Sequence, residues 1–408
     1  MRHFQQLPDT QAAMLFHRIP AEFTRNSPPD QLAVALGATL YAPAVRPNLA
    51  DDLARCHRDG LMSLVCCLED AIRDDEVDAA EVNLAYQLRR FADTGSSGFV
   101  AEGGDDEPDG PLLFIRVRHH DQIYRMAERL GDAMRVVSGF VLPKFRPDES
   151  GRAAVQAVHD IAAATALPVY AMPVLETPEI AHAESRLETL IQIRQLLDRF
   201  RDRVLATRVG VTDLCGWYGL RRPAELTAWD LGLISTTLTD IINVMARRDH
   251  AGDGYVISGP VWEYFTGGER VLKPLLRESP FTEHDPNGRI LRRKLVRDAL
   301  DGLIREILLD RANGLTGKTI IHPSHASAVH ALSVVSHEEY SDAVVIAADA
   351  NGAGGVLRSA YANKMNEVRP HYAWAQLTLL RARMFGVAAE GVSFVDFLDA
   401  SVDRELVA

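Results

Sequence analysis

Cysteine is scarce in this sequence, and the four cysteines, Cys56, Cys66, Cys67 and Cys215, form no Cys-x-x-Cys pair. Cys66 and Cys67 lie inside an apolar run, which indicates buried thiols rather than zinc ligands or disulfides. Free thiols are typical of a reducing compartment, so we expect a cytoplasmic protein. Long apolar runs are also missing: none reaches the ~18 residues of a membrane span, and the first residues show no signal-peptide pattern.

Positive charge is in short supply as well. Lys and Arg number 44 against 56 Asp and Glu, which leaves a formal net charge of −12. Nucleic-acid binding needs a basic surface that neutralises phosphates, so nucleic acid is not expected as the main partner. The sequence also lacks a Gly-x-Gly-x-x-Gly motif after its first apolar run, which disfavours a dinucleotide-binding fold.

Short apolar runs separated by helix-length segments are what the sequence does contain. Runs of this kind predict buried parallel strands, and eight of them predict a closed (β/α)8 TIM barrel rather than an open sheet. Helical periodicity is clearest at 291–308, which is followed by the stop signal Asn313-Gly314, and recurs at 231–245 and 370–385. The predicted strands are residues 38–43, 62–68, 112–117, 139–143, 168–175, 205–211, 254–258 and 318–321.

The pattern divides the chain into three parts. We expect an N-terminal arm at 1–36, a TIM-barrel catalytic domain at 37–345 and a C-terminal helical extension at 346–408. A long irregular insertion at 260–290 would shape one rim of the barrel. The extension carries too many large apolar residues for a free tail. This predicts either packing on its own barrel or, as we favour, docking across a subunit interface in a homo-oligomer such as a trimer.

Six of the apolar runs are followed by polar side chains with a chemical use. In a TIM barrel the C-terminal ends of all strands form one rim, and reactive side chains lie there. We therefore expect these residues to meet in an active site. They are Glu69 and Asp70, Arg116, Lys144, Glu176, Asp213 and His322.

Glu176 and Asp213 follow neighbouring predicted strands. Adjacent strand ends lie about 5 Å apart, so both carboxylates can reach one cation. Mg²⁺ is commonly held by one or two protein carboxylates, with water and substrate oxygens completing its shell. The pair therefore predicts a Mg²⁺ site, with Mn²⁺ as the other suitable ion; the alternative is that each acid caps a helix or pairs with an arginine.

Two arginines are candidates for binding an anionic substrate. Arg116 offers a planar, permanently charged fork for a carboxylate or a developing enolate. Its alternative role is an ion pair with Glu69 or Asp70, and the two roles are compatible because such a pair would orient the arginine. Arg46, just after the first strand, is the second candidate.

Lys144 and His322 are less clear. Lys144 is either a cationic binder or a Schiff-base nucleophile, and the latter is disfavoured because a metal pair is already available to activate a carbonyl. His322 and His325 have a spacing that resembles a zinc site, but no His-Glu-x-x-His pattern or nearby cysteine supports zinc. Packing of a turn is the favoured role of this histidine pair, with His322 retained as a candidate substrate contact.

Taken in order, seven segments resemble the HpcH/HpaI aldolase and citrate lyase β-subunit superfamily. They span residues 37–345, and their order is more specific than any one of them. The sequence looks most like a divergent branch of carbon–carbon bond lyases often found in stress-response and tellurium-resistance operons. The segments are LYAPAVRP at 40–47, CLEDAI at 67–72, IRV at 115–117, LPK at 142–144, LETP at 175–178, GVTD at 210–213 and GKTIIHP at 317–323.

The resemblance implies a TIM barrel in which Glu176 and Asp213 ligate Mg²⁺ and Arg116 contacts the substrate's carboxylate or carbonyl. Glu69 and Asp70 would surround these groups. Members of the family act on 2-oxo acids or on acyl-thioesters such as citryl-CoA, and some take a base from a neighbouring subunit. The insertion at 260–290 departs from the short citrate lyase pattern, so the use of a CoA thioester stays open.

The function that follows is a Mg²⁺-dependent carbon–carbon bond lyase acting on a small organic acid or its acyl-thioester. It would cleave or form a bond next to a carbonyl through a metal-stabilised enolate, since a Lewis acid and an arginine both stabilise that charge. The alternative is a catalytically idle barrel that binds an organic acid or a partner protein. A phosphate-containing substrate near Arg221 and Arg222 is a third interpretation, without a glycine-rich cradle.

Overall fold

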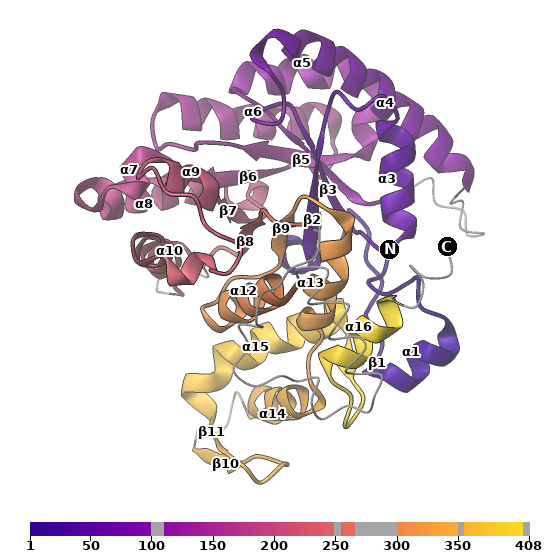
Figure 1. Cartoon of the computed structure of the whole chain (residues 1–408), viewed down its shortest axis with the longest axis vertical. Coiled ribbons are helices and arrows are strands. Elements are labelled where there is room, and N and C mark those ends of the chain that lie inside the picture. The colour runs from indigo at the N-terminus through magenta and orange to yellow at the C-terminus, as the bar shows by residue number, and fades with distance from the viewer. Residues whose placement is uncertain (99–109, 249–253, 266–299, 350–354, 403–408) are drawn as a thin grey trace.

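The computed structural model describes residues 1–98, 110–248, 254–265, 300–349 and 355–402. Eight parallel strands close into a barrel, and β2 completes it by pairing with both β3 and β9. The predicted (β/α)8 TIM barrel is therefore confirmed (Figure 1). The barrel strands are β2 (Ala38–Pro43), β3 (Ser63–Cys67), β4 (Leu112–Arg116), β5 (Val137–Leu142), β6 (Tyr170–Leu175), β7 (Thr207–Val209), β8 (Ile257–Trp262) and β9 (Lys318–Ile320).

Helices surround the barrel because successive side chains of a strand point to opposite faces. Phe114 belongs to the cluster inside the barrel, whereas its neighbour Ile115 belongs to the cluster under the helices. Apolar runs without polar alternation are what such doubly buried strands require. The surrounding helices are α3 (Leu49–Arg58), α4 (Val77–Gly98), α5 (His120–Leu130), α6 (Glu149–Thr165), α7 (Pro178–Ala181), α8 (Ala183–Asp198), α9 (Val211–Gly216), α10 (Gly232–Met245), α12 (Leu300–Ala312) and α13 (Ala326–Ser333).

Most strands differ from their predicted bounds by one or two residues, and two differences affect the rim. The prediction placed the seventh barrel strand at 254–258, but β8 runs to Trp262 through Pro260, with an irregular register opposite β9. Residues 260–262, predicted as the start of the irregular insertion, therefore belong to the strand; proline is tolerated there because the ladder is irregular. β7 ends at Val209, so Asp213 lies in the first turn of α9 instead of directly on the strand end.

The predicted C-terminal stop of the last barrel helix is confirmed. α12 ends at Ala312, and Gly314 adopts a φ of 91°, the left-handed conformation that suits glycine after a helix. Residues 291–299, predicted as the start of this helix, lie outside the described residues, as does 266–290 of the predicted insertion. No helix in the described ranges is long and apolar enough to cross a membrane.

The N-terminal arm and the C-terminal extension lie side by side in Figure 1. The short strand β1 pairs antiparallel with β12, although nearly the whole chain separates them. The arm contributes its second helix to the same layer as the extension's long helix α15. The elements are α1 (Asp9–Leu15), β1 (Phe16–Arg18) and α2 (Pro29–Ala35), then α14 (His337–Ala348), β10 (Val356–Arg358), β11 (Met365–Glu367), α15 (Val368–Phe385), β12 (Val387–Ala388) and α16 (Phe394–Val402).

This layer closes the N-terminal end of the barrel. Phe23 and Leu32 of the arm and Phe385 of α15 share one buried cluster with Met62 and Leu112, which stand at the starts of β3 and β4. The contacts leave the opposite rim, where the strands end, for the functional residues.

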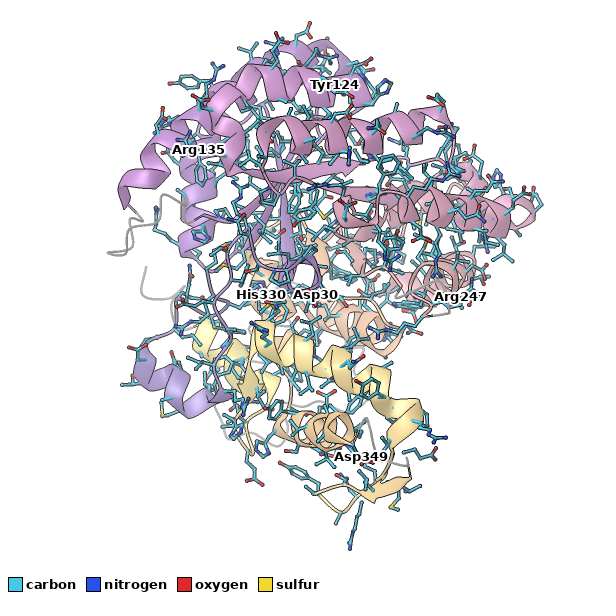
Figure 2. All side chains as sticks on the ribbon, turned by 180° about the vertical axis from the view of Figure 1, so that it is seen from behind. Asp30, Tyr124, Arg135, Arg247, His330 and Asp349 are labelled. Carbon is cyan, nitrogen blue, oxygen red and sulfur yellow. The ribbon has the colours of Figure 1, made fainter. Side chains whose placement is uncertain are left out.

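Buried histidines hold the junction between arm and extension together. His3 Nε2 lies 2.8 Å from the carbonyl oxygen of Ala35, and the His3 ring stacks on Phe385 with centroids 4.2 Å apart. His330, labelled in Figure 2, lies beside His3 with a centroid distance of 4.8 Å. Burial lowers the pKa of His3 to about 4, partly opposed by its backbone hydrogen bond, and burial also lowers the pKa of His330. Both rings are therefore neutral at pH 7.

Candidate active site

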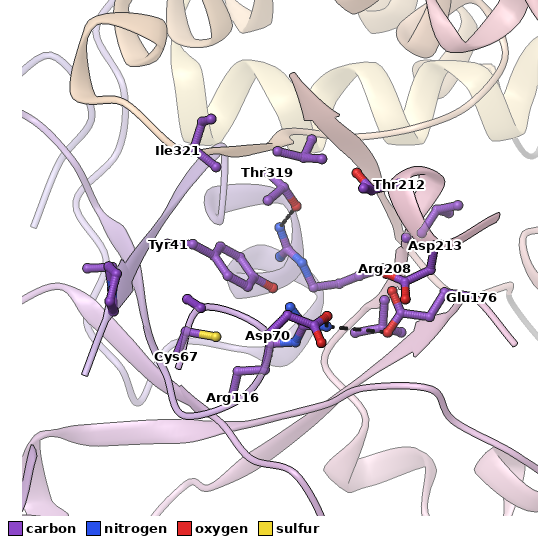
Figure 3. A pocket seen from close by; sticks show the side chains of 17 residues that line it. Tyr41, Cys67, Asp70, Arg116, Glu176, Arg208, Thr212, Asp213, Thr319 and Ile321 are labelled. Atoms are coloured by element: carbon purple, nitrogen blue, oxygen red, sulfur yellow. Dashed lines mark hydrogen bonds and ion pairs between the residues drawn. The ribbon is translucent and has the colours of Figure 1, made fainter. Parts of the chain in front are cut away.

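A cavity of about 460 Å³ opens among the C-terminal ends of the barrel strands. Figure 3 shows its labelled side chains arriving from several different strands and turned toward a common space. This is the rim at which TIM-barrel enzymes carry their catalytic groups. The lining side chains with polar atoms are Tyr41, Cys67, Asp70, Arg116, Glu176, Arg208, Thr212, Asp213 and Thr319.

Arg116, the last residue of β4, is at the centre of the carboxylates. Its Nη2 lies 2.7 Å from Glu69 Oε2, 3.2 Å from Asp70 Oδ2 and 3.5 Å from Glu176 Oε1. The side chain is only 13% exposed, yet it lines the cavity. The ion pair considered as an alternative role is therefore present, and it orients the arginine at the cavity wall.

Lys144 lies over the same carboxylates. Its Nζ is 2.5 Å from Glu69 Oε1, 3.1 Å from Asp70 Oδ1 and 3.8 Å from Asp213 Oδ1. Hydrogen bonds and charge from Glu69 and Asp70 outweigh burial and raise the pKa of Lys144. A Schiff-base lysine needs a lowered pKa to be nucleophilic, so this geometry disfavours that role.

The backbone of Lys144 adopts a strained conformation that directs its N–H at Glu176. Its φ of 48° lies in the left-handed region, which costs a non-glycine residue about 1–2 kcal/mol. In this conformation its N–H donates to Glu176 Oε1 at 2.9 Å. The strained residue after Pro143 thereby helps to fix the Glu176 carboxylate.

Glu176 and Asp213 lie close together, as the neighbouring strands predicted. β6 and β7 pair through Val174 with Arg208 and Leu175 with Val209. Glu176 is 2% exposed, and burial raises the pKa of its carboxyl to about 7; Arg116 opposes the rise, while the negative charge of Asp213 adds to it. Two carboxylates that repel each other in this way are suited to sharing a cation.

Gly210 makes room for the Glu176 carboxylate. A Cβ at this position would lie 1.7 Å from Glu176 Oε2, an impossible distance. The glycine between β7 and α9 is thus required because the carboxylate of the neighbouring strand lies directly against the backbone. The sequence showed Gly210 inside a motif, but only the structure gives this reason for it.

The other two carboxyls of the cluster titrate in opposite directions. Burial raises the pKa of Glu69, although Arg116 and Lys144 oppose the rise. For Asp70, burial is outweighed by its hydrogen bond with Glu69 and by the charges of Arg116 and Lys144, which lower its pKa. Asp70, half exposed at the rim, is therefore the firmly ionised member of this pair.

The donor set suits Mg²⁺ better than zinc. Within the described residues no group of three His, Cys, Asp or Glu side chains forms a ready metal cage. Mg²⁺ does not need one, since one or two carboxylates with water and substrate oxygens suffice. Glu176 and Asp213 supply two hard oxygen ligands at the cavity wall, and their mutual repulsion would be relieved by a divalent cation.

Four sequence-predicted residues are absent from the cavity lining. Glu69 and Lys144 still contact the charged groups of its wall, whereas Arg46 and His322 lie apart from them. Arg46 is exposed and pairs with Asp52, with Nε and Oδ2 2.7 Å apart. His322 is exposed, and its Nδ1 lies 2.8 Å from Ser324 Oγ, which is the turn-packing role. His325 is buried, and burial lowers its pKa to about 4.

Arg208, Tyr41 and Thr319 line the cavity and were not predicted as site residues. Arg208 lies within the apolar run of β7, where a charged residue signals either a buried ion pair or a ligand contact. That single charged residue in an apolar run was the available signal. Thr319 and Tyr41 carry no comparable sign in the sequence, because hydroxyl residues are common in strands.

Comparison with known proteins agrees with this geometry. The family described as C–C bond lyase of the TIM-barrel fold matches residues 30–387. The chain belongs to this family. It is therefore an enzyme of the carbon–carbon lyase class, and the resemblance found in its motifs is confirmed at the level of the superfamily. A search of curated proteins found no match.

The solved structures similar to this C–C bond lyase include a citrate lyase and CitE. A citrate lyase from Burkholderia xenovorans is 17% identical, with 96% of this chain and 98% of that chain covered and a TM-score of 0.57. CitE of Mycobacterium tuberculosis, solved in complex with magnesium, acetoacetate and coenzyme A, is 18% identical, with 86% and 99% covered and a TM-score of 0.48. At 17% identity the likeness to the Burkholderia xenovorans citrate lyase shows the fold alone.

Proposed function

We propose that this enzyme is a Mg²⁺-dependent lyase that cleaves or forms a carbon–carbon bond next to a carbonyl of a small organic acid or its acyl-thioester. One observation carries the proposal: Arg116 contacts Glu176, and Glu176 lies beside Asp213, all on the wall of one cavity at the C-terminal rim. Cleavage next to a carbonyl leaves negative charge on the carbonyl oxygen, and this wall gathers the groups that stabilise it.

Glu176 and Asp213 would hold the ion, which when bound acts as a Lewis acid on the substrate carbonyl. Arg116 would donate to the oxygen on which charge develops, from a position fixed by Glu69 and Asp70. Because these donors are already oriented, little reorganisation is needed during the reaction. Lys144 would serve as a cationic neighbour and, through its N–H, as a holder of Glu176.

Calorimetry with the Glu176→Gln and Asp213→Asn variants tests the metal site. Both variants should bind Mg²⁺ more weakly than the unchanged protein while their circular dichroism stays that of a folded barrel. Mn²⁺ should bind to the same residues, because it also accepts oxygen ligands. Unchanged Mg²⁺ affinity in both variants would contradict the assignment. Arg46→Gln, which changes a charge outside the cavity, is the matched control.

We further propose that the chain divides into an arm at 1–36, a barrel at 37–345 and an extension at 346–408, and that this division serves assembly as a homo-oligomer. The protein would act in the cytoplasm on an organic acid or acyl-CoA. Its gene would lie in a stress-response or tellurium-resistance operon. The extension leaves Trp374 and Leu377 exposed on α15, and Val345 is exposed on α14, which leads into it; these apolar side chains support a subunit contact. The substitutions Trp374→Glu and Leu377→Glu should then dissociate the assembly in light scattering; a monomeric full-length chain would contradict this proposal.

A further inference from the structure

Arg208 is a buried cation beside the proposed active site, and its surroundings differ from those of Arg116. Its side chain, 1% exposed, lines the cavity. Arg116 has three carboxylates within reach. In the described part of the chain, no carboxylate pairs with Arg208. A buried charge without a counter-ion is costly and is rarely retained without a use.

The contacts of Arg208 fix its orientation but leave some of its N–H donors without an acceptor. Nη2 donates to Thr319 Oγ1 at 2.6 Å, and Nη1 lies 3.9 Å from Met172 Sδ, which is a weak acceptor. The guanidinium carbon lies 5.5 Å from the centroid of the Tyr41 ring. Nε is buried and has no hydrogen-bond partner among the described residues. An arginine has five N–H donors in a fixed fork, so donors remain for a ligand.

Figure 3 shows the Arg208 side chain extending toward Tyr41 and Thr319, whereas Glu176 and Asp213 lie on the other side of the cavity. Both sets line the same cavity of about 460 Å³, so one small molecule can contact both. The proposed metal and Arg116 would act at the carbonyl. The other side of the cavity presents a cation, a hydroxyl and an aromatic ring.

We propose that Arg208, oriented by Thr319 and Tyr41, binds a carboxylate of the substrate that does not take part in bond cleavage. This rests on the proposed function insofar as the ligand is the lyase's substrate. The substrate is then a small acid that keeps a free carboxylate apart from the reacting carbonyl, such as a 2-oxo dicarboxylic acid or a dicarboxylic half-thioester. Arginine suits this group because its planar fork matches the two oxygens of a carboxylate.

Calorimetry on the Mg²⁺-loaded full chain tests the proposal, with acetate, succinate and inorganic phosphate as probes and uncharged succinamide as the control ligand. Acetate and succinate should bind to the unchanged protein, and succinamide should not. Arg208→Met should weaken both acids at least tenfold while Mg²⁺ affinity stays the same. The affinity of Arg208→Lys for both acids should lie between that of the unchanged protein and that of Arg208→Met, because lysine keeps the charge but loses the planar fork.

Melting temperature separates this role from a purely structural one. If Arg208 serves a ligand, Arg208→Met removes an unpaired buried charge, and the ligand-free protein should melt no lower than the unchanged chain. Thr319→Val is a second variant that keeps the volume of the side chain, and it should weaken succinate binding with little change in melting temperature. A large drop in melting temperature with unchanged acid binding would overturn the proposal, as would binding of phosphate in preference to both acids.

The test also separates this inference from the metal assignment. Failure of the proposed function would appear as Mg²⁺ affinity that Glu176→Gln and Asp213→Asn leave unchanged. Failure of the present inference would appear as acid binding that Arg208→Met leaves unchanged in a protein whose Mg²⁺ site behaves as expected.

Discussion

Two sets of buried charges lie in this barrel, and they are organised differently. Behind β8 and β9, Arg222 and Lys318 face Glu306 and Asp310, all less than 4% exposed. Lys318 Nζ lies 2.8 Å from Glu306 Oε1 and 2.7 Å from Asp310 Oδ2, and Arg222 pairs with the other oxygen of Glu306. Every charge of this closed cluster has a partner of opposite sign.

The closed cluster is completed by neutral donors. The backbone N–H of Ala228 donates to Glu306 Oε2 at 2.7 Å, and the Trp229 indole donates to Asp310 Oδ1 at 2.8 Å. Arg222 also donates to the carbonyl oxygen of Val261 at 2.6 Å. The cluster thus ties α12 and the segment before α10 to the last two strands, and none of its four charged side chains lines the cavity at the C-terminal rim.

The charged side chains that line the cavity, the cavity cluster, are not all paired with an opposite charge. Arg116 has carboxylate partners and Arg208 has none among the described residues, while Glu176 and Asp213 repel each other. Satisfied buried charges stabilise one arrangement, whereas unsatisfied ones leave binding capacity for a ligand. The two clusters therefore differ in whether their charges are paired, although Arg222 of one and Arg208 of the other are both almost fully buried.

Breaking the closed cluster should have the largest effect on stability. Glu306→Leu would leave Arg222 without its carboxylate and Lys318 with one partner fewer, so we expect a loss of about 3–5 kcal/mol in the free energy of unfolding. Urea denaturation followed by circular dichroism measures it. Arg208→Met, equally buried but in the cavity cluster, is the matched control and should lose far less. Equal losses in the two variants would contradict the distinction.

Filling the space at Gly210 should damage the proposed metal site while sparing the closed cluster. Gly210→Ala places a methyl group where Glu176 Oε2 now lies, so the carboxylate must move. We expect Mg²⁺ affinity to fall on the order of 10–100-fold, as for other changes that displace a metal ligand. Calorimetry measures this, and Gly216→Ala, where a Cβ has open space, is the control. Unaltered affinity in Gly210→Ala would argue against Glu176 as a ligand.

Replacing the fork of Arg116 should affect turnover more than stability. Arg116→Lys keeps the positive charge among Glu69, Asp70 and Glu176 but loses planar, two-point donation. Turnover should fall more than about tenfold, with a small change in melting temperature. Once a substrate is identified, steady-state kinetics beside a thermal melt checks this. Unchanged turnover per folded molecule with a collapsed melting temperature would show that the arginine is structural.

Mild acid should lower the free energy of unfolding, because the buried His3 of the arm is neutral rather than charged. Because burial lowers the pKa of His3 to about 4, the unfolded chain binds more protons than the folded one below pH 6.5. The contribution of the neutral His3 to the free energy of unfolding is then fully present above pH 6.5. It is lost as pH falls toward 4, by roughly 1.4 kcal/mol per pH unit for one histidine. Unfolding measured from pH 7 to 5 should show this slope, and His3→Phe should flatten it. A slope unaffected by His3→Phe would contradict the role of this ring.

Periodicity sufficed for the barrel, since doubly buried strands must be apolar and each run was long enough to be recognised. It was wrong at residues 260–262, which were predicted as the start of an insertion but belong to β8, where Trp262 pairs with Ile320 of β9. The arm and extension illustrate a different limit. Their pairing through β1 and β12 joins residues near opposite ends of the chain, and no local pattern encodes such a contact.

The sequence alone determined the TIM barrel and the meeting of Glu69, Asp70, Arg116, Lys144, Glu176 and Asp213, because all of them follow strands whose ends share one rim. The tertiary structure decided which charges have partners. Arg222 faces Glu306 and Arg208 faces a cavity, and the sequence did not predict either contact. Pairing depends on atoms brought within a few ångströms by strands and helices that are distant in the chain, and that proximity exists only in the folded barrel.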